Sequence, residues 1–531
     1  MLHGRSGRGR YLFAATLALA LGACSAVEKR PVGTVGHVRG FAGMVAADEP
    51  RAAVVGRDVL SAGGNAADAA TAMYFAMAVT YPSAASLGGG GSCIVHDKGK
   101  KKIEVMEFPA IVSTMAGSLP SAVPANPRGF FALHAKYGKL RFESLLAEPE
   151  RMARLGVPVS RALANDLSKA LPVLGRDPGA RSVFFRPDGS ILREGDMLAQ
   201  PQLAAVIANI RRNTGDFYVG IGARDLVRGV QAAGGTLTLE DLRDIKPAWR
   251  ETLTVKIGLD TAHLAPPPSV GSTLAGQMIG ALWGRWKDAP EEERSHLVAE
   301  TSARAFADRS RWMMPSGWSR EDVSGLLAAE RLTAMMNDYN PAGHVAVSGM
   351  SAPPSDFPLG AGLVVMDGEG SAVVCGVTTH GLFGTGRIAP GTGIVLAGIP
   401  GPFGPPPITT LITMNHNSNE VRFVGTSSGG ATAPLALTQS FLSTVADGKP
   451  VSDAVAMPRL IHPGLPDAVY VESGPHALDP APLQQRGHQV NVVAMPSRVQ
   501  ALICREGYNN PESCEVGTDP RGFGLASKVG Q

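Results

Sequence analysis

Two apolar runs separated by a short glycine-containing turn are the strongest constraint on how the last third of this chain folds. Residues 362–367 (GLVVMD) and 371–380 (SAVVCGVTTH) flank the turn at 368–370. Two strand-like runs around such a turn predict a β-hairpin. The second run ends in Thr378, Thr379 and His380, and a hydroxyl beside an imidazole is common in nucleophilic catalysis. Whether one of these threonines acts as a nucleophile depends on where the first strand begins.

The pattern of the chain changes from helices to strands shortly before this hairpin. Residues 128–345 are rich in segments with apolar positions at helical spacing. Residues 346–359 are rich in proline and small residues, which indicates a linker. After the hairpin, a strand predicted over 420–428 leads through two glycines into a helix predicted over 431–447.

An earlier helix is predicted to be buried on all sides. Asn65 follows two glycines and is a good N-cap for a helix over 66–79. This span is alanine-rich and nearly apolar all round, so we expect it in the interior.

The chain begins like an exported protein. A basic segment precedes the apolar run 11–23, which is too short to span a bilayer of about 30 Å, so residues 1–23 are predicted to be a signal peptide. The run ends in Leu-Gly-Ala-Cys24, which resembles the lipobox of bacterial lipoproteins, whose cysteine is acylated after the chain is cut before it. A plain secretion signal with a coincidental cysteine is the alternative.

Ser25 follows this cysteine. In the lipoprotein resemblance, a residue other than aspartate at this position favours the outer membrane over the inner one. We therefore expect a protein of the bacterial cell envelope, lipid-anchored through Cys24 on the periplasmic face of the outer membrane, with residues 24–40 as a tether.

Composition excludes some classes of partner. The chain has 49 basic and 46 acidic residues, and three of the arginines lie in the signal peptide, so the remaining charges balance and give no basic excess for nucleic acid. The 12 histidines form no ligand-type cluster in the sequence. We expect neither a metal site nor a cofactor.

The four cysteines after Cys24 divide into two pairs. Cys504 and Cys514 flank a polar, turn-rich segment, and an exported protein lies in an oxidising compartment, so a disulfide is predicted between them. Cys93 and Cys375 each lie inside an apolar stretch. We expect them to be small buried hydrophobic residues rather than reactive thiols.

Ordered motifs along nearly the whole chain after residue 40 carry a family resemblance. They include GMVAADEPRA, DVLSAGGNAADAA, SLGGGGSCIVHD, HLVAETSARAFADR, FGTG, GTSSGG and GTDPRG. In these motifs the chain resembles γ-glutamyltransferase, an N-terminal nucleophile hydrolase. The resemblance implies an α/β protein, a four-layer αββα sandwich. It also implies a large-subunit-like part over 41–345 and a small-subunit-like part over 360–531.

The resemblance places a glycine at the nucleophile position. Members of the family cut their own chain before a threonine that begins the first strand of the hairpin, and the freed amino group acts as the base. Here Gly360, Ala361 and Gly362 stand in place of the family's Thr-Thr-His, and no serine, threonine or cysteine lies between Ser355 and Ser371. Glycine has no hydroxyl, so an unprocessed chain without transferase or glutathione hydrolase activity is predicted.

The implied substrate positions also differ from the family. Met106 stands where the resemblance places an arginine for the substrate α-carboxylate, and residues 397–402 (AGIPGP) replace a polar stretch that contacts the amino-acid end. Ile408 and Thr409 correspond roughly to a pair of serines. A desolvated amino acid needs charged or polar partners, and the recognised ones are missing.

Some positions keep the family's residues or lie in its pocket. Gly429 and Gly430 resemble the oxyanion-hole glycines, although backbone geometry alone explains such a pair. Phe383 and Gly384 resemble the floor of the site. His380 occupies the position of an asparagine that lines the glutamyl pocket; it either lines a remodelled cleft or is a satisfied histidine without a function.

Three functions fit these observations. The first is a membrane-anchored pseudoenzyme that binds a small molecule or an envelope protein. The second is an active γ-glutamyl hydrolase, transferase or acylase that uses Thr378, Thr379 or Cys375 with His380 as base; Thr378 and His380 share a strand face. The third is an envelope component that inherits the fold without its chemistry.

Overall fold

The computed structural model describes Met1 and residues 40–347, 360–401, 404–405, 408–474, 477–495 and 497–530. Val38–Gln531 form one compact unit. The predicted signal peptide, Cys24 and most of the predicted linker lie outside the described residues. Within the described ranges, no helix is long and apolar enough to cross a bilayer.

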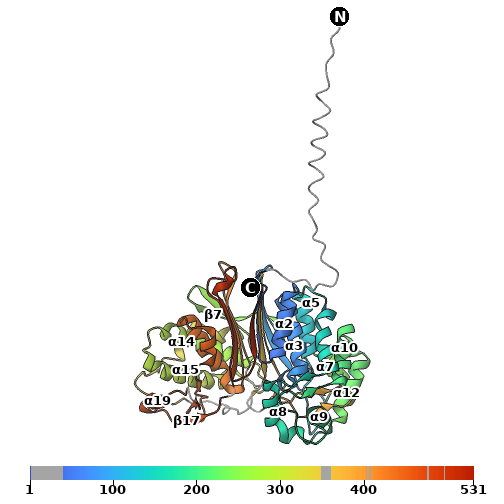
Figure 1. Cartoon of the computed structure of the whole chain (residues 1–531). Helices are drawn as coiled ribbons and strands as arrows, with labels where there is room; N and C mark the ends of the chain where they lie inside the picture. The colour runs from blue at the N-terminus through green and yellow to red at the C-terminus, as the bar shows by residue number, and fades with distance from the viewer. Residues whose placement is uncertain are drawn as a thin grey trace. The chain divides into compact units, whose positions relative to one another are not determined.

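Two antiparallel sheets form the centre of the molecule (Figure 1). The seven-stranded sheet has the order β20 (Leu525–Val529), β1 (Gly43–Ala47), β9 (Ala361–Asp367), β10 (Ala372–Thr378), β2 (Gly90–Asp97), β3 (Lys102–Phe108) and β6 (Ala248–Arg250). The six-stranded sheet has the order β19 (Cys514–Thr518), β18 (Arg498–Cys504), β14 (Glu420–Ser428), β13 (Thr409–Asn415), β8 (Asp260–Leu264) and β7 (Leu253–Ile257).

Helices cover the outer face of each sheet (Figure 1). The longer helices on the side of the seven-stranded sheet are α2 (Pro50–Ser61), α3 (Ala66–Thr80), α5 (Asn126–Tyr137), α7 (Ala147–Leu155), α8 (Arg161–Leu174), α9 (Pro178–Phe184), α10 (Pro201–Arg212) and α12 (Ile221–Ala232). Those on the other side are α14 (Val270–Trp286), α15 (Glu291–Trp312), α16 (Ala329–Ala334), α17 (Ala433–Phe441), α18 (Val451–Ala456) and α19 (Ala481–Gln485). The predicted four-layer αββα sandwich is confirmed.

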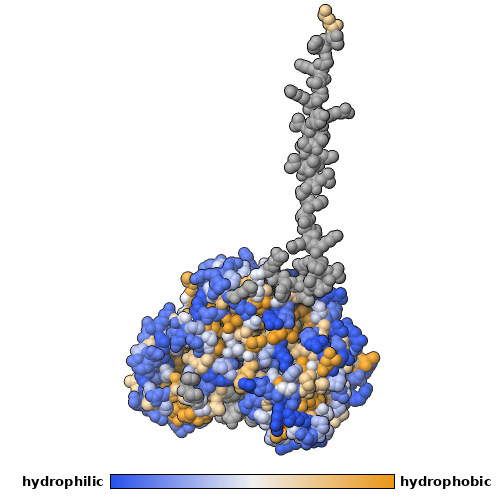
Figure 2. All heavy atoms as spheres, in the orientation of Figure 1, coloured by the Kyte–Doolittle hydropathy of each residue, from blue (hydrophilic) through white to orange (hydrophobic). Residues whose placement is uncertain are grey.

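Three apolar layers hold the sandwich together. One lies between the seven-stranded sheet and its helices, one between the six-stranded sheet and its helices, and a third, with Ile94, Val364 and Ile412, lies between the two sheets. Hydrophilic residues predominate along the outer flanks of the face in Figure 2. Burial of apolar surface in these layers is the main stabilising term.

Local sequence signals explain the boundaries of α3. The Asn65 side chain accepts a hydrogen bond from the Asp68 N–H, and the Asp68 carboxylate accepts one from the Asn65 N–H. This capping box satisfies two donors that the first turn leaves free. All 15 residues of the helix are buried, as its apolar circumference predicts.

The large-subunit-like and small-subunit-like parts share both sheets. Strand β1, from the first part, pairs with β9 and β20 of the second, and β10 pairs with β2. The six-stranded sheet likewise joins β7 and β8 to four strands of the second part. The two parts therefore form a single core rather than separate domains.

A smaller sheet lies beside α15 on the six-stranded side. It has the order β15 (Leu460–Ile461), β16 (Val469–Glu472) and β17 (Val490–Val493). Two-stranded pairs join β4 (Val157–Pro158) to β5 (Met197–Leu198) and β11 (Ile388–Ala389) to β12 (Ile394–Val395).

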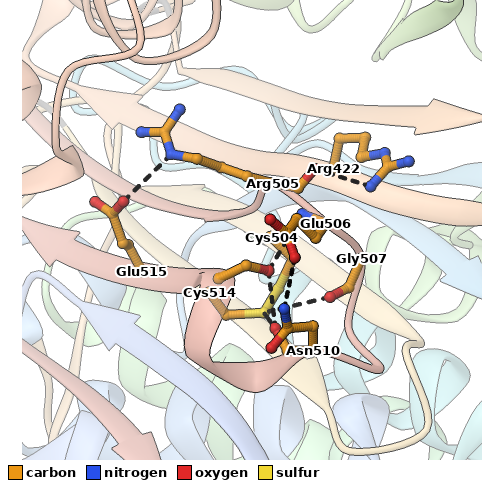
Figure 3. Close-up of a disulfide and its surroundings, with 9 residues drawn as sticks. Arg422, Cys504, Arg505, Glu506, Gly507, Asn510, Cys514 and Glu515 are labelled. Atoms are coloured by element: carbon orange, nitrogen blue, oxygen red, sulfur yellow. Dashed lines mark hydrogen bonds and ion pairs between the residues drawn. A yellow bond between two sulfur atoms is a disulfide. The ribbon is translucent and has the colours of Figure 1, made fainter.

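Both described disulfides join residues directly opposite each other on neighbouring strands. Cys504 bonds to Cys514 across β18 and β19 (Figure 3). Cys93 bonds to Cys375 across β2 and β10. The expectation that Cys93 and Cys375 are unpaired hydrophobic residues is wrong, because the strand register brings their Cα atoms to 4.1 Å, although both are buried as expected.

Candidate ligand-binding cleft

Gly360 lies directly before β9 in a conformation that suits glycine. It is buried and has φ of 110°, a region that residues with a Cβ rarely adopt. A Cβ at this position would lie 2.9 Å from the Val377 carbonyl oxygen on β10. The backbone at the start of β9 is therefore fitted to a residue without a side chain.

Ile408 fills the space beside this position. Its Cδ1 would be 3.1 Å from a Cβ added to Gly360, and its Cγ2 would be 1.9 Å from a Cβ added to Gly376. The isoleucine therefore packs over two glycines. An apolar side chain occupies the site at which the family resemblance places the nucleophile and one of the paired serines.

Gly362 is also closely surrounded. Its N–H donates to Asp48 Oδ2 over 2.7 Å, and an added Cβ would lie 2.5 Å from Thr426 Cγ2. Burial raises the pKa of Asp48, and the Gln500 side chain donates a hydrogen bond to its other oxygen. The position has no room for the imidazole that the resemblance would place there.

A cleft of about 360 Å³ opens between the two sheets at the end of the sandwich where β3 and β10 finish. This volume is in the usual range for small-molecule sites. Its lining is mostly apolar and includes Pro109, Ala110, Ile111, Val112, Pro268, Val270, Pro315, Trp318, Pro400, Pro405 and Ile408. The polar lining residues are Ser92, Glu107, Ser269, Ser316, Thr378 and His380.

Glu107 is the acidic group of this lining. Its side chain is 1% exposed, and Arg250 Nε lies 2.9 Å from its Oε2. Burial raises the pKa of Glu107 to about 8, and the charge of Arg250 opposes that rise. The carboxyl group therefore sits near its titration point at neutral pH.

The Thr378 hydroxyl is not activated by the neighbouring imidazole. Its Oγ1 accepts a hydrogen bond of 2.9 Å from the backbone N–H of His380. The His380 Nδ1 atom is buried and has no hydrogen-bond partner among the described residues. Burial lowers the pKa of His380 to about 4, so the ring is neutral at pH 7, but no contact connects it to a threonine hydroxyl in the described structure.

Other predicted site residues lie away from the cleft lining. The Thr379 hydroxyl is buried and donates to the Gly381 carbonyl over 2.7 Å. Phe383 is fully buried and packs edge-on against Phe184. Cys375 is held in a disulfide, so it offers no free thiol for attack.

The glycines of the predicted site floor and oxyanion hole are closely packed. Gly384 has φ of 55°, and an added Cβ would lie 2.2 Å from the Leu396 carbonyl oxygen. Gly429 has φ of 124° and lies against the Ser497 backbone, and Gly430 begins a short 3₁₀ turn. Among the described residues, none of these three glycines lines the cleft.

Met106, which stands at the family's arginine position in the resemblance, does not line the cleft. Its side chain is fully buried in the layer between the seven-stranded sheet and its helices. Pro109 and Ala110, just beyond the end of β3, line the cleft instead. Successive strand residues point to opposite faces, so Met106 and the cleft-lining Glu107 face different layers.

Four of the 12 histidines meet in space, which the sequence did not indicate. They come from four separate segments. His296, His344 and His488 lie next to Glu300, and His462 lies next to His344 and His488. The expectation of no metal site rests on the spacing of histidines in the sequence, which does not reveal this grouping in space.

Comparison with known proteins agrees with this architecture. The model of the gamma-glutamyltranspeptidase family matches residues 52–398 and 407–529. The chain belongs to this family. It is 27% identical over 540 residues to the glutathione hydrolase proenzyme of Escherichia coli strain K12. The aligned region covers 92% of this chain and 90% of that protein.

Other known proteins are similar over most of the chain. Scoloptoxin SSD14 of Scolopendra dehaani is 27% identical over 487 residues, or 81% of this chain and 83% of that protein. Among solved structures, cephalosporin acylase from Bacillus halodurans superposes with a TM-score of 0.79 at 24% identity, over 94% of this chain and 98% of that one. This last likeness shows a common fold.

Proposed function

We propose that this family member is a binding protein that stays uncleaved, has no transferase or hydrolase activity, and takes a small, mostly apolar ligand in the cleft. The observation that carries the proposal is Gly360, which supplies no hydroxyl and whose φ and close contact with Val377 favour glycine over residues with a Cβ. Self-cleavage and acyl transfer both need a nucleophilic side chain at that position.

The lining defines the chemistry of the expected ligand. Apolar side chains and prolines dominate it, and the one carboxyl group is already paired with Arg250. A free amino acid carries an ammonium and a carboxylate that both need partners once water is removed. A neutral molecule with an aromatic or aliphatic body and one or two hydrogen-bonding groups suits the cleft better.

The alternative nucleophile has little geometric support. A general base must lie within hydrogen-bond reach of the hydroxyl it activates. The Thr378 hydroxyl is instead bonded to the backbone N–H of His380.

Processing and turnover test the catalytic half of the proposal. On a denaturing gel run with reductant, we expect one band near the full mature mass and no release of nitroaniline from L-γ-glutamyl-p-nitroanilide. Two fragments split near residue 360 would contradict the uncleaved chain. Turnover that disappears in Thr378→Ala or Thr379→Ala would show a non-standard nucleophile.

Ligand binding tests the other half. A panel of neutral aromatic and aliphatic fragments should raise the melting temperature, whereas L-glutamate should not. Ile111→Asp, at the cleft, should abolish the shift, and Leu259→Asp, at a position 86% exposed in a distant turn, should preserve it. Equal responses of both variants would contradict binding in the cleft.

We also propose that the protein is lipid-anchored in the bacterial envelope through Cys24. The support is the basic segment, the short apolar run and the lipobox-like end of that run. Cells fed a radiolabelled fatty acid should label the wild-type protein and not Cys24→Ser. Labelling of both forms equally, or of neither, would contradict the anchor.

A further inference from the structure

A buried histidine cluster lies on the six-stranded side of the molecule, apart from the cleft. His296 and Glu300 lie one turn apart on α15, His344 follows α16, His462 follows β15, and His488 precedes β17. Figure 1 shows α15, α19 and β17 in the same region. Residues far apart in the sequence therefore supply imidazoles to one place.

Short contacts connect the members of this cluster. His344 Nδ1 lies 2.6 Å from Glu300 Oε1, and its Nε2 lies 3.0 Å from Asp467 Oδ1. His462 Nε2 lies 3.1 Å from the same Asp467 oxygen. Nitrogen atoms of His344, His462 and His488 all lie within 4.8 Å of one another.

The ionisable groups of this cluster are buried, which is costly unless each has a partner. His462 and Glu300 are 0% exposed and His488 is 5% exposed. His488 Nδ1 is buried and has no hydrogen-bond partner among the described residues. Buried imidazole nitrogens are normally satisfied by a hydrogen bond or by a metal, so an unpartnered one beside two other histidines indicates a missing ligand.

We propose that His344, His462 and His488 bind one divalent transition-metal ion of the Zn²⁺ class, with Asp467, which contacts the first two histidines, as a fourth ligand. Imidazole nitrogen and carboxylate oxygen are ligands that Zn²⁺ accepts in four-coordinate sites, with bonds of about 2.0 to 2.2 Å. In a tetrahedral site of that size, neighbouring ligand atoms are roughly 3.3 Å apart. The 3.0 and 3.1 Å distances from Asp467 Oδ1 to the two Nε2 atoms are close to this spacing.

The surrounding charges favour a cation. Glu300 Oε1 faces His344 and His488, while its other oxygen is paired with Arg304. His296 bridges His488 and the Asn340 carbonyl. These groups would orient His344 and His488 from behind, as carboxylate and imidazole partners do around bound metals.

Metal binding would exchange existing contacts for bonds to the ion. The ion would replace a proton between His344 and Asp467. Binding through Nε2 of His462 moves its ring proton to Nδ1, so the 3.2 Å hydrogen bond from the Gly464 N–H would be lost. Asp467 is 36% exposed and provides the route by which the ion enters.

The site would have a structural role. It would join the segment after α16 to the small sheet of β15, β16 and β17, next to α15. A ligand that binds the folded chain alone stabilises it. This inference does not depend on the proposed function of the cleft.

Metal uptake by the full chain is the test, with Zn²⁺ and Co²⁺ as probes. After treatment with chelator and desalting, we expect one Zn²⁺ per chain by calorimetry and elemental analysis, and a rise in melting temperature that chelator reverses. Co²⁺ should give the visible absorption bands of a four-coordinate site.

Variants place the site. His344→Ala and Asp467→Asn should each lose stoichiometric uptake and the Co²⁺ bands. His416→Ala, which alters an exposed histidine of a separate pair with His263, should keep both. Circular dichroism of each metal-free variant shows whether it has folded. If His344→Ala does not fold, Asp467→Asn still tests the site, because it changes a partly exposed residue without changing the volume of its side chain.

Three results would overturn the proposal. They are less than one bound ion per chain at saturating Zn²⁺, full uptake by His344→Ala and Asp467→Asn, or loss of uptake in His416→Ala alone. Any of them would mean that the cluster does not hold the ion.

Discussion

The cleft and the histidine cluster differ in the side chains they bring together: the cleft is mostly apolar, and the cluster is made of ionisable groups. The cleft lies next to the position where the family resemblance places the nucleophile: Gly376 and Ile408 line it, and Gly360 lies beside Ile408 without a side chain that could react. The cluster lies on the opposite side of the six-stranded sheet and holds imidazoles and carboxylates in close contact.

This difference shows that a conserved fold does not keep its chemistry in one place. The core around the cleft is closely packed, and the proposed loss of activity there would come from a few side chains. In the cluster, buried ionisable groups must be paired to be tolerated, so each depends on its neighbours. We therefore expect substitutions in the cluster to be more destabilising than substitutions around the cleft.

The largest effect should come from the carboxylate at the centre of the cluster. Glu300→Ala leaves Arg304 and His344 without their buried partner, and should lower the free energy of unfolding by about 3 to 5 kcal/mol. Chemical denaturation of the metal-free protein measures this. Glu292→Ala, at an exposed position of the same helix, should change it by less than about 0.5 kcal/mol, and similar losses in both would contradict a paired core.

Restoring a threonine at the nucleophile position should destabilise the chain without activating it. Gly360→Thr combines an unfavourable φ with a 2.9 Å contact to Val377 O, and should cost about 3 kcal/mol. Gly258→Thr is the matched control, because Gly258 has φ of 63° with open space around it; it should cost only about 1 kcal/mol. Cleavage of Gly360→Thr at residue 360 would show that the site needs only a hydroxyl.

Replacing the cleft carboxyl group should stabilise the protein at high pH. Burial raises the pKa of Glu107 to about 8 from a usual value of 4.5. The folded state therefore favours the protonated carboxyl group, whose contribution to stability is full below pH 4.5 and is lost as pH rises to 8. Glu107→Gln should therefore gain on the order of 2 kcal/mol at pH 9 and almost nothing at pH 4. Denaturation curves across this range test the sign, with the exposed Glu251→Gln as control. A loss at pH 9 would mean that the Arg250 pair dominates.

The smallest effect should come from the threonine that resembles a nucleophile. Thr378→Val removes the acceptor of one backbone hydrogen bond from His380. The expected cost is about 1 kcal/mol, with ligand-induced stabilisation unchanged for fragments that do not use this hydroxyl. A cost above about 3 kcal/mol would indicate a larger role for Thr378 than one hydrogen bond.

Features encoded by neighbouring residues were predictable from the sequence. The hairpin of β9 and β10 follows from two apolar runs around a turn, strand β14 matches its predicted range 420–428, and α3 follows from its cap and its alanine-rich span. The helix predicted over 431–447 is instead divided into a 3₁₀ turn, α17 and a π-helical turn. The apolar pattern of residues 431–447 indicates a helix but does not distinguish α-helical from 3₁₀ or π-helical turns.

Features that depend on long-range contacts were not predictable. The partner of Cys93 lies 282 residues away, and neither apolar context distinguishes a buried thiol from a disulfide. The histidine cluster draws single residues from four segments, so no local spacing indicates it. Met106 was matched to the family's arginine position by resemblance alone, and the sequence did not indicate that this strand residue faces the helix layer rather than the cleft.

The bond between Cys93 and Cys375 closes a covalent ring that includes the predicted linker over 346–359. A single cut in that linker would open the backbone but leave the two pieces attached through sulfur. Such a nicked chain would migrate as one species without reductant, and its halves could neither diffuse apart nor exchange with those of another molecule. On a denaturing gel, a cut anywhere between Cys93 and Cys375 is therefore visible only after the disulfide is reduced.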